Sequence, residues 1–162
     1  MGESDPSNPA SVKSRIHLYV HAVWAVSERR SLMGRTVRVV LFSHLRKTGE
    51  EKGIRILATG GSEDHMHVLL QLHPAQNLAQ VVRQLKAESA DWLQSTKVVD
   101  GDFAWEEDYL AFSVSPNVLR QVTDYLGRQD EYHSKNSLDE ELDLFEKLQS
   151  GPTGSDAKDG QS

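Results

Sequence analysis

The chain has 162 residues, which is enough for one domain with a sizeable core and short tails. It contains no cysteine, which excludes disulfides, thiolate metal sites and a cysteine nucleophile. The formal net charge is −6, but residues 138–162 carry −5 and residues 1–12 carry −2, which leaves +1 for the central part. No apolar run reaches membrane-spanning length. We therefore expect a cytoplasmic protein without a membrane partner, whose body can face a polyanion locally.

Residues 1–14 are rich in Ser, Pro, Asn and Gly and show no periodicity, so a disordered tail is expected there. Residues 16–26 then alternate between apolar and polar side chains, which predicts a strand. One face of this strand would carry Ile16, Leu18, Val20, Trp24 and Val26, and the other His17, Tyr19 and His21. The first face suits a core, and the second places histidines opposite it.

A helix is predicted from Arg35 to about Lys52, where apolar residues recur at helical spacing and Gly53 ends the pattern. A short strand follows over residues 54–59, and Gly60-Gly61-Ser62 forms a turn into the next strand. The short connection favours an antiparallel hairpin.

The strand after this turn, Glu63-Asp64-His65-Met66-His67-Val68-Leu69-Leu70, is the most informative stretch of the chain. Its alternation points His65 and His67 to one face, with Met66, Val68, Leu70 and Leu72 on the other. Two imidazoles about 7 Å apart along a strand provide half of a metal site. A polar sheet face without a metal is the alternative.

Further along, Asn77 can cap a helix whose polar face includes Arg83 and Lys86. This face is either solvated or a phosphate-contacting surface. A strand is predicted over residues 109–113, and Ser115-Pro116 begins a last helix that runs to about His133. The resulting order predicts an α+β fold with a ferredoxin-like antiparallel sheet, in which the first and third strands are neighbours. The last helix would then pack on the histidine-bearing face.

In the last helix, Tyr125 and Gln129 lie one turn apart on the same face. The amide oxygen of Gln129 would supply the third ligand that the two histidines lack, with the Tyr125 hydroxyl close to the ion. The alternative is a tyrosine at the edge of the core beside a solvated glutamine.

Two separated motifs resemble those of the single-tyrosine HUH transposases of bacterial insertion sequences, the IS200-like transposases, and their repeat-associated (REP-associated) tyrosine relatives. They are the segment from Glu63 to Leu70 and Tyr125-Leu126-Gly127-Arg128-Gln129-Asp130-Glu131-Tyr132-His133. Supporting similarities lie at residues 19–25 and 105–113, and the resemblance covers about residues 15–148. Tyr132 departs from the pair of histidines that many relatives carry there, and Gly127 interrupts the catalytic helix, either for close approach or for movement.

The resemblance implies that His65, His67 and Gln129 bind Mg²⁺ or Mn²⁺ and that Tyr125 is the nucleophile. The expected activity is cleavage and rejoining of single-stranded DNA, at hairpins near element or repeat ends, through a 5′-phosphotyrosine and a free 3′-hydroxyl, by a homodimer. Asp64 would either hold the imidazole of a metal-binding histidine in place or contact the ion itself. Basic residues available for DNA phosphates, each otherwise a solvated charge, are Arg83, Lys86, Arg120, Arg128 and Lys135.

We divide the chain into a disordered tail (1–14), a transposase domain (15–136), an acidic C-terminal helix (137–148) and a second disordered tail (149–162). The acidic helix either competes with DNA for the basic surface or docks on the body through Leu142, Phe145 and Leu148. Two other functions stay open: a domesticated hairpin-binding protein without transposition, and a metal-dependent hydrolase in which Tyr125 is structural.

Overall fold

The computed structural model describes residues 14–129, 133 and 136–149. Both predicted disordered tails fall almost wholly outside these residues. Four antiparallel strands form one sheet in the order β2-β3-β1-β4. The strands are β1 (Tyr19–Ala25), β2 (Arg55–Gly61), β3 (His65–Gln71) and β4 (Leu110–Val114). This order confirms the ferredoxin-like arrangement, including the predicted neighbours β1 and β3.

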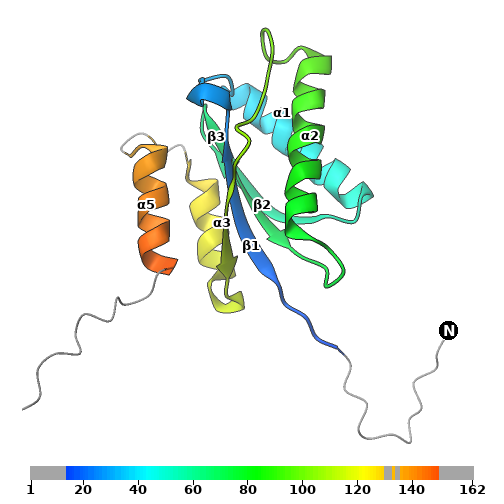
Figure 1. Cartoon of the computed structure of the whole chain (residues 1–162), viewed down its shortest axis with the longest axis vertical. Coiled ribbons are helices and arrows are strands. Elements are labelled where there is room, and N and C mark those ends of the chain that lie inside the picture. Colours follow the sequence, from blue (N-terminus) through cyan, green and yellow to red (C-terminus); the bar gives the residue numbers. More distant parts are fainter. Residues whose placement is uncertain (1–13, 130–132, 134–135, 150–162) are drawn as a thin grey trace, which may run out of the picture.

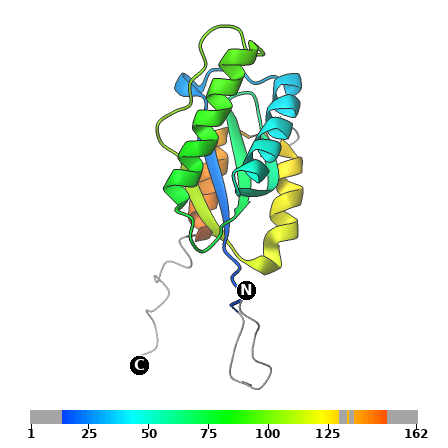
Figure 2. The same cartoon turned by 90° about the vertical axis from the view of Figure 1, so that its right-hand side faces the viewer.

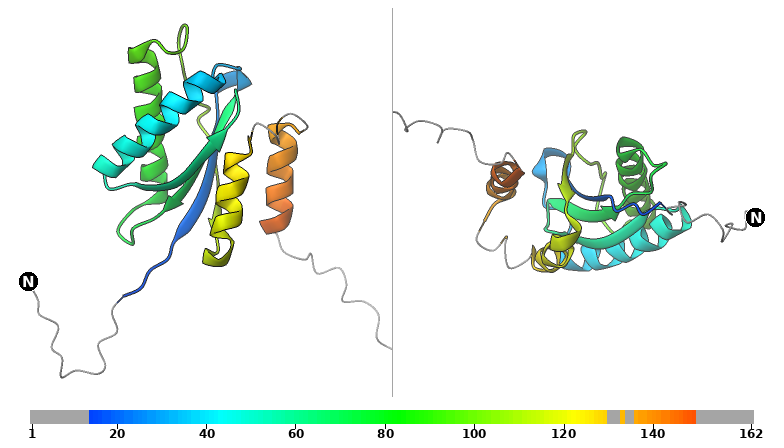
Figure 3. Two further views of the ribbon diagram at one scale, coloured as in Figure 1. Left: turned by 180° about the vertical axis from the view of Figure 1, so that it is seen from behind. Right: turned by 90° about the horizontal axis from the view of Figure 1, so that it is seen from below.

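The helices are divided between the two faces of the sheet. One face is covered by α1 (Arg35–Glu51) and α2 (Leu78–Thr96), and the other by α3 (Leu119–Gly127) and α5 (Leu138–Gln149). The two pairs lie on opposite sides of the strands in Figure 1 and, seen from behind, in the left panel of Figure 3. Short 3₁₀ turns, η1 (Ser27–Arg29) and η2 (Pro116–Val118), follow β1 and precede α3. Within the described residues, no helix has the length and apolarity needed to cross a bilayer.

Helices α1 and α2 lie side by side over one face of the sheet (Figure 2). The main apolar core lies between these helices and the strands. The alternation predicts the core side of these strands. The side chains that enter the core there are Ala22 and Trp24 of β1, Val26 just after it, and Met66, Val68 and Leu70 of β3. Leu41 and Leu45 from α1 and Val82 and Leu85 from α2 pack against them. The predicted cap of α2 is confirmed, because the Asn77 side chain accepts a hydrogen bond from the Gln80 amide at 3.2 Å.

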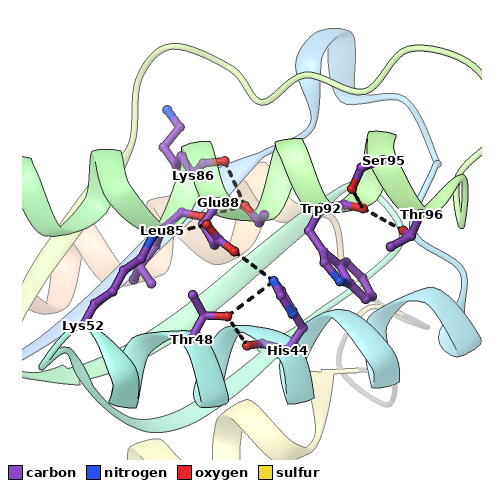
Figure 4. Close-up of polar contacts among 10 residues, drawn as sticks. His44, Thr48, Lys52, Leu85, Lys86, Glu88, Trp92, Ser95 and Thr96 are labelled. Carbon is purple, nitrogen blue, oxygen red and sulfur yellow. Dashed lines mark hydrogen bonds and ion pairs between the residues drawn. The ribbon is translucent and has the colours of Figure 1, made fainter.

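A polar network joins α1 and α2 at the rim of this core (Figure 4). The Glu88 carboxylate contacts His44 Nε2 at 3.1 Å and Lys52 Nζ at 3.2 Å. The His44 ring also stacks on Trp92, with ring centroids 4.5 Å apart. The side chain of Glu88 keeps 30% of its surface exposed, so water still solvates these pairs.

Two predicted strand boundaries are wrong. The first strand begins at Tyr19 rather than Ile16, and Ile16 and Leu18 are 41% and 47% exposed. The predicted polar face of this strand consisted of His17, Tyr19 and His21. His17 is exposed, and only His21 contacts a histidine of β3. The second strand continues through Gly60 and Gly61 instead of turning there. The reason is that both glycines pair with β3, opposite His67 and Met66.

The prediction of one helix from Ser115 to about His133 is also wrong. The segment begins as a 3₁₀ turn without a side-chain cap, and α3 ends at Gly127. At Arg128 the amide bonds to the Tyr125 carbonyl, three residues back, and the backbone leaves the helical region. Glycine lowers helix stability by about 1 kcal/mol relative to alanine, which favours a break here. Gln129 therefore follows the end of α3.

The C-terminal helix docks on the sheet beside β1. Ser137 and Glu140 form a reciprocal capping box, with hydrogen bonds of 3.2 and 3.3 Å, that fixes its start. Leu138 is buried against Val23 and Ala25, and Leu142 packs on the same cluster. The predicted contacts of Phe145 and Leu148 lie outside the described side chains.

Candidate active site

The β3 histidines lie at the centre of the face covered by α3 and α5. Both His65 and His67 are fully buried. The sheet register places His65 opposite Ala25 and His67 opposite Val23, the two β1 residues on which α5 docks. The fold thus brings the C-terminal helix over the histidine pair.

His65 is oriented by its neighbour in sequence. Its Nδ1 lies 2.8 Å from Oδ1 of Asp64, and this hydrogen bond lowers the pKa of the Asp64 carboxyl below its ordinary value. An ionised carboxylate only accepts, so Nδ1 carries a proton. The other ring nitrogen, Nε2, faces the site and lies 3.4 Å from Oε1 of Gln129.

His67 is oriented from β1. Its Nδ1 lies 2.8 Å from Nε2 of His21, and the two rings stack. Burial lowers the pKa of His67 to about 4 and that of His21 to about 3, so both rings are neutral at pH 7. The Nε2 atom of His67 points toward α5.

Tyr125 reaches the pair from α3. Its ring is half-buried, with its centroid 6.3 Å from that of His67 and its plane perpendicular to it. The helix approaches so closely because Gly60 lies beneath it: a Cβ at Gly60 would collide with the main-chain carbonyl of Leu126. Gly127, by contrast, has open space around it and plays no part in close packing.

Gln129 is held by a charged histidine. Its Oε1 lies 2.9 Å from Nε2 of His133, whose Nδ1 lies 2.9 Å from the Asn136 carbonyl. Because both partner oxygens only accept, His133 is protonated on both nitrogens. Burial acts against this charge, but the nearby Glu141 carboxylate outweighs burial and raises the pKa of His133. Gln129 is only 2% exposed, which rules out the solvated glutamine considered above.

Glu141 from α5 is the site residue that sequence reasoning missed. Its side chain is fully buried, with Oε1 2.7 Å from His67 Nε2 and Oε2 2.6 Å from His133 Nε2. Burial tends to raise the pKa of this carboxyl, but the contacts with His133, His67 and Tyr125 outweigh burial and lower it. The helical spacing could have indicated its burial, because Glu141 lies three residues after Leu138 and therefore on the apolar face of its helix.

The donor atoms suit a divalent cation. One atom each from His65, His67, His133 and Glu141 lie within 4.8 Å of one another, and of these the protonated His133 has no free lone pair, so the histidines of β3 and Glu141 are the possible ligands. Within the described part of the chain, five buried side-chain atoms lack a well-formed hydrogen bond, and four belong here: His67 Nε2, Gln129 Nε2 and both Glu141 oxygens. Imidazole nitrogens together with amide and carboxylate oxygens suit a divalent metal ion.

The basic residues proposed for DNA contact are spread over both faces. Arg120 and Arg128 are exposed on and just after α3, on the side of the site. Arg83 is exposed on α2, across the sheet. Lys86, also on α2, donates to the main-chain carbonyls of Glu106 and Glu107 at 2.6 and 2.8 Å. Lys135 lies outside the described residues.

A ferredoxin-like sheet with two buried histidines on a central strand, and a tyrosine and a glutamine brought to them from outside the sheet, defines the single-tyrosine HUH class of transposase. The chain belongs to the IS200-like transposase family, whose sequence model, "Transposase IS200 like", matches residues 14–129. It is a transposase, an enzyme that cleaves and rejoins DNA in transposition.

Two curated relatives are similar over most of their length. The ISDra2 transposase TnpA of Deinococcus radiodurans is 27% identical over 125 residues, which cover 72% of this chain and 89% of the relative. The transposase for insertion sequence element IS200 of Salmonella typhimurium is 28% identical over 130 residues, covering 76% and 82%.

Solved structures share the fold. A crystal structure of a transposase from Deinococcus radiodurans R1 aligns with a TM-score of 0.57 and 23% identity, covering 80% of this chain and 98% of the other. A REP-associated tyrosine transposase, solved bound to a REP hairpin, aligns with a TM-score of 0.55 and 16% identity, covering 76% and 74%.

Proposed function

We propose that this transposase is a metal-dependent endonuclease and strand transferase for single-stranded DNA, with Tyr125 as nucleophile. The observation that carries the proposal is the convergence of four side chains from separate segments: His65 and His67 from β3, Tyr125 from α3, and Gln129 from beyond it. A protein that only bound DNA would not need this combination.

Phosphodiesters resist attack because their negative oxygens repel a nucleophile. His65, His67 and Gln129 would hold Mg²⁺ or Mn²⁺, which supplies charge stabilisation at the scissile phosphate when bound. Asp64 and His21 fix the two imidazoles from behind, so that each presents Nε2 to the site.

In the cleavage step, the phenolic oxygen of Tyr125 bonds to phosphorus and the bond from phosphorus to the 3′ oxygen breaks. The proton of the tyrosine hydroxyl ends on the leaving 3′ oxygen. The products are a 5′-phosphotyrosine and a free 3′-hydroxyl. Attack by another 3′-hydroxyl reverses these bond changes, releases Tyr125 and joins the strands.

We propose hairpin DNA as the substrate and a homodimer as the active form. The first is supported by the similarity to a transposase solved on a REP hairpin, and by the exposed Arg120 and Arg128 on either side of Tyr125. The second rests on the family resemblance. Light scattering after size-exclusion chromatography tests it, with a mass near 36 kDa expected from two chains of 18.1 kDa.

The test is capture of labelled single-stranded hairpin DNA, drawn from the sequence flanking the gene, on a denaturing gel with Mg²⁺ or Mn²⁺. We expect a metal-dependent covalent adduct in the wild type and in Tyr132→Phe, and none in Tyr125→Phe. Binding without an adduct would favour the domesticated hairpin-binding protein. Cleavage without an adduct would favour the hydrolase.

A further inference from the structure

Glu141 occupies the site but lies outside residues 14–129, the part of the chain that the family model matches. The family match ends at residue 129, whereas Glu141 is in the first turn of the acidic C-terminal helix. Its carboxylate is nevertheless fully buried against His67, His133 and Tyr125. The carboxylate therefore reaches the site from the C-terminal helix, outside the matched residues.

The placement of Glu141 is built into the helix. The Ser137 and Glu140 capping box fixes the first turn, and Leu138 and Leu142 dock that turn on Val23 and Ala25. Glu141 lies between the two leucines in the sequence and on the same side of the helix. Neighbouring acids face outward instead, since Asp139, Glu140 and Asp143 are all exposed. One of the four acids from residue 139 to residue 143 has thus been brought inside.

A buried carboxylate is costly unless strong partners compensate for its lost hydration. His133 compensates on one side, because its positive charge lies at Nε2, 2.6 Å from Oε2 of Glu141. The oxygen Oε1 instead faces Nε2 of His67, the imidazole nitrogen that the proposed mechanism assigns to the metal. Both residues belong to the group whose ligand atoms lie within 4.8 Å of one another, and an imidazole nitrogen and a carboxylate oxygen so placed suit a shared cation.

We propose that Glu141 is a direct ligand of the divalent ion, so that the ion joins the C-terminal helix to the histidine strand. This inference rests on the proposed metal dependence. His65, His67, Gln129 and Glu141 would supply four ligands, which leaves two positions of a six-coordinate ion for substrate and water. His133 is a positioning residue, because its charge holds both Gln129 and Glu141.

The experiment measures Mn²⁺ affinity of the full chain without DNA, by the electron paramagnetic resonance signal of free Mn²⁺. We expect Glu141→Gln to bind on the order of 10- to 100-fold more weakly than the wild type, an effect at least as large as the loss of an outer-shell partner. Glu141→Asp distinguishes direct coordination from a general effect of negative charge. It keeps the charge but moves the carboxylate back by one methylene group, so this variant should also bind Mn²⁺ weakly. Asp143→Asn, which removes an exposed acid from the same helix, should match the wild type.

The outcomes separate the inference from the function on which it rests. If the wild type binds no Mn²⁺, the proposed metal dependence fails and the inference with it. If the wild type binds Mn²⁺ and Glu141→Gln binds it equally or more tightly, only the inference fails. The Glu141 carboxylate would then compete with the ion for the histidines and would have to move away before the ion binds. If Glu141→Asp binds like the wild type, Glu141 acts through charge and not as a ligand.

A second measurement needs no variant and so does not depend on one that folds. Hydrogen exchange of the wild type with and without Mn²⁺ follows the backbone amides of α5. Coordination by Glu141 should slow exchange over residues 138–149, because the ion ties the helix to the sheet. Faster exchange there on adding Mn²⁺ would show that the ion displaces Glu141 and would overturn the inference.

Discussion

Each face of the sheet carries a glutamate that contacts a histidine, but the glutamate on one face is partly exposed and the glutamate on the other is fully buried. On the face under α1 and α2, Glu88 joins His44 and Lys52 at the rim, with 30% of its side chain exposed. On the other face, Glu141 joins His67 and His133 with no exposure at all. Exposed pairs cost little desolvation and contribute little, whereas buried pairs lose much of their attraction to desolvation.

This difference shows that the two faces serve different ends. The first face gains its stability from apolar packing, and its charges are peripheral. The second face buries three histidines of the strands, a glutamine and a carboxylate, which an apolar cluster of similar volume would replace at no loss of stability. Such a set is explained by the chemistry it performs, and substitutions on the two faces should have separable effects.

The largest effect on stability is expected from Leu70→Ala, in the apolar core. Leu70 is fully buried, and truncation of such a side chain costs about 2–5 kcal/mol. Urea unfolding measures the loss. Because Leu70 points away from the histidines, the Mn²⁺ affinity of the folded protein should be unchanged, and a parallel fall in affinity would show that the faces are coupled.

Gly60→Ala should disturb the histidine face through its backbone. The added methyl group collides with the Leu126 carbonyl, and overpacking of this kind costs about 1–3 kcal/mol. It should also displace α3 and weaken adduct formation at Tyr125. Gly127→Ala is the matched control, since its methyl group meets open space. Equal effects of the two substitutions would contradict the close approach of α3 to β2.

Asp64→Ala should reduce Mn²⁺ affinity about 10- to 100-fold, because His65 would lose the partner that fixes its ring. The free energy of unfolding should change far less than in Leu70→Ala. The neighbouring Glu63 is exposed, so Glu63→Ala serves as control for the removal of one negative charge. Equal losses of affinity in both variants would indicate a general electrostatic effect instead of orientation.

The smallest effect is expected from Glu88→Gln, about 0.2–1 kcal/mol at pH 7. Burial opposes the ionised form of Glu88, but Lys52 and His44 outweigh burial and lower the pKa of its carboxyl below 4.5. Its contribution to stability is therefore complete above pH 4.5 and lost as the pH falls through the lowered pKa. Urea unfolding of both proteins at pH 7 and in acid should show the difference disappear at low pH.

The sheet and its two faces were predictable because alternation in the strands is a local pattern. Trp24, Met66, Val68 and Leu70 all enter the core that the alternation predicts. The start of β1 could not be predicted in this way. Ile16 and Leu18 continue the alternation, but the partner strand β3 ends at Gln71, which pairs with Tyr19. Periodicity shows which face a residue would join but not where pairing stops.

The histidine face was predictable only in part. The His65 and His67 pair and the Tyr125 and Gln129 spacing were visible as motifs, although the helix that carries Tyr125 ends before Gln129. Glu141 was not found, because its role depends on where a separate helix docks. Its position beside Leu138 and Leu142 marked it as buried, but nothing local indicated that the histidines lie beneath.

The most direct test of the central claim is to identify the residue that carries DNA after cleavage. Trypsin separates the two candidate tyrosines, because Arg120, Arg128 and Lys135 place Tyr125 in the peptide 121–128 and Tyr132 in the peptide 129–135. After reaction with hairpin DNA and nuclease trimming, mass spectrometry should find a 5′-phosphonucleotide on peptide 121–128. A modified peptide 129–135, with 121–128 unmodified, would contradict the assignment of Tyr125 as the nucleophile.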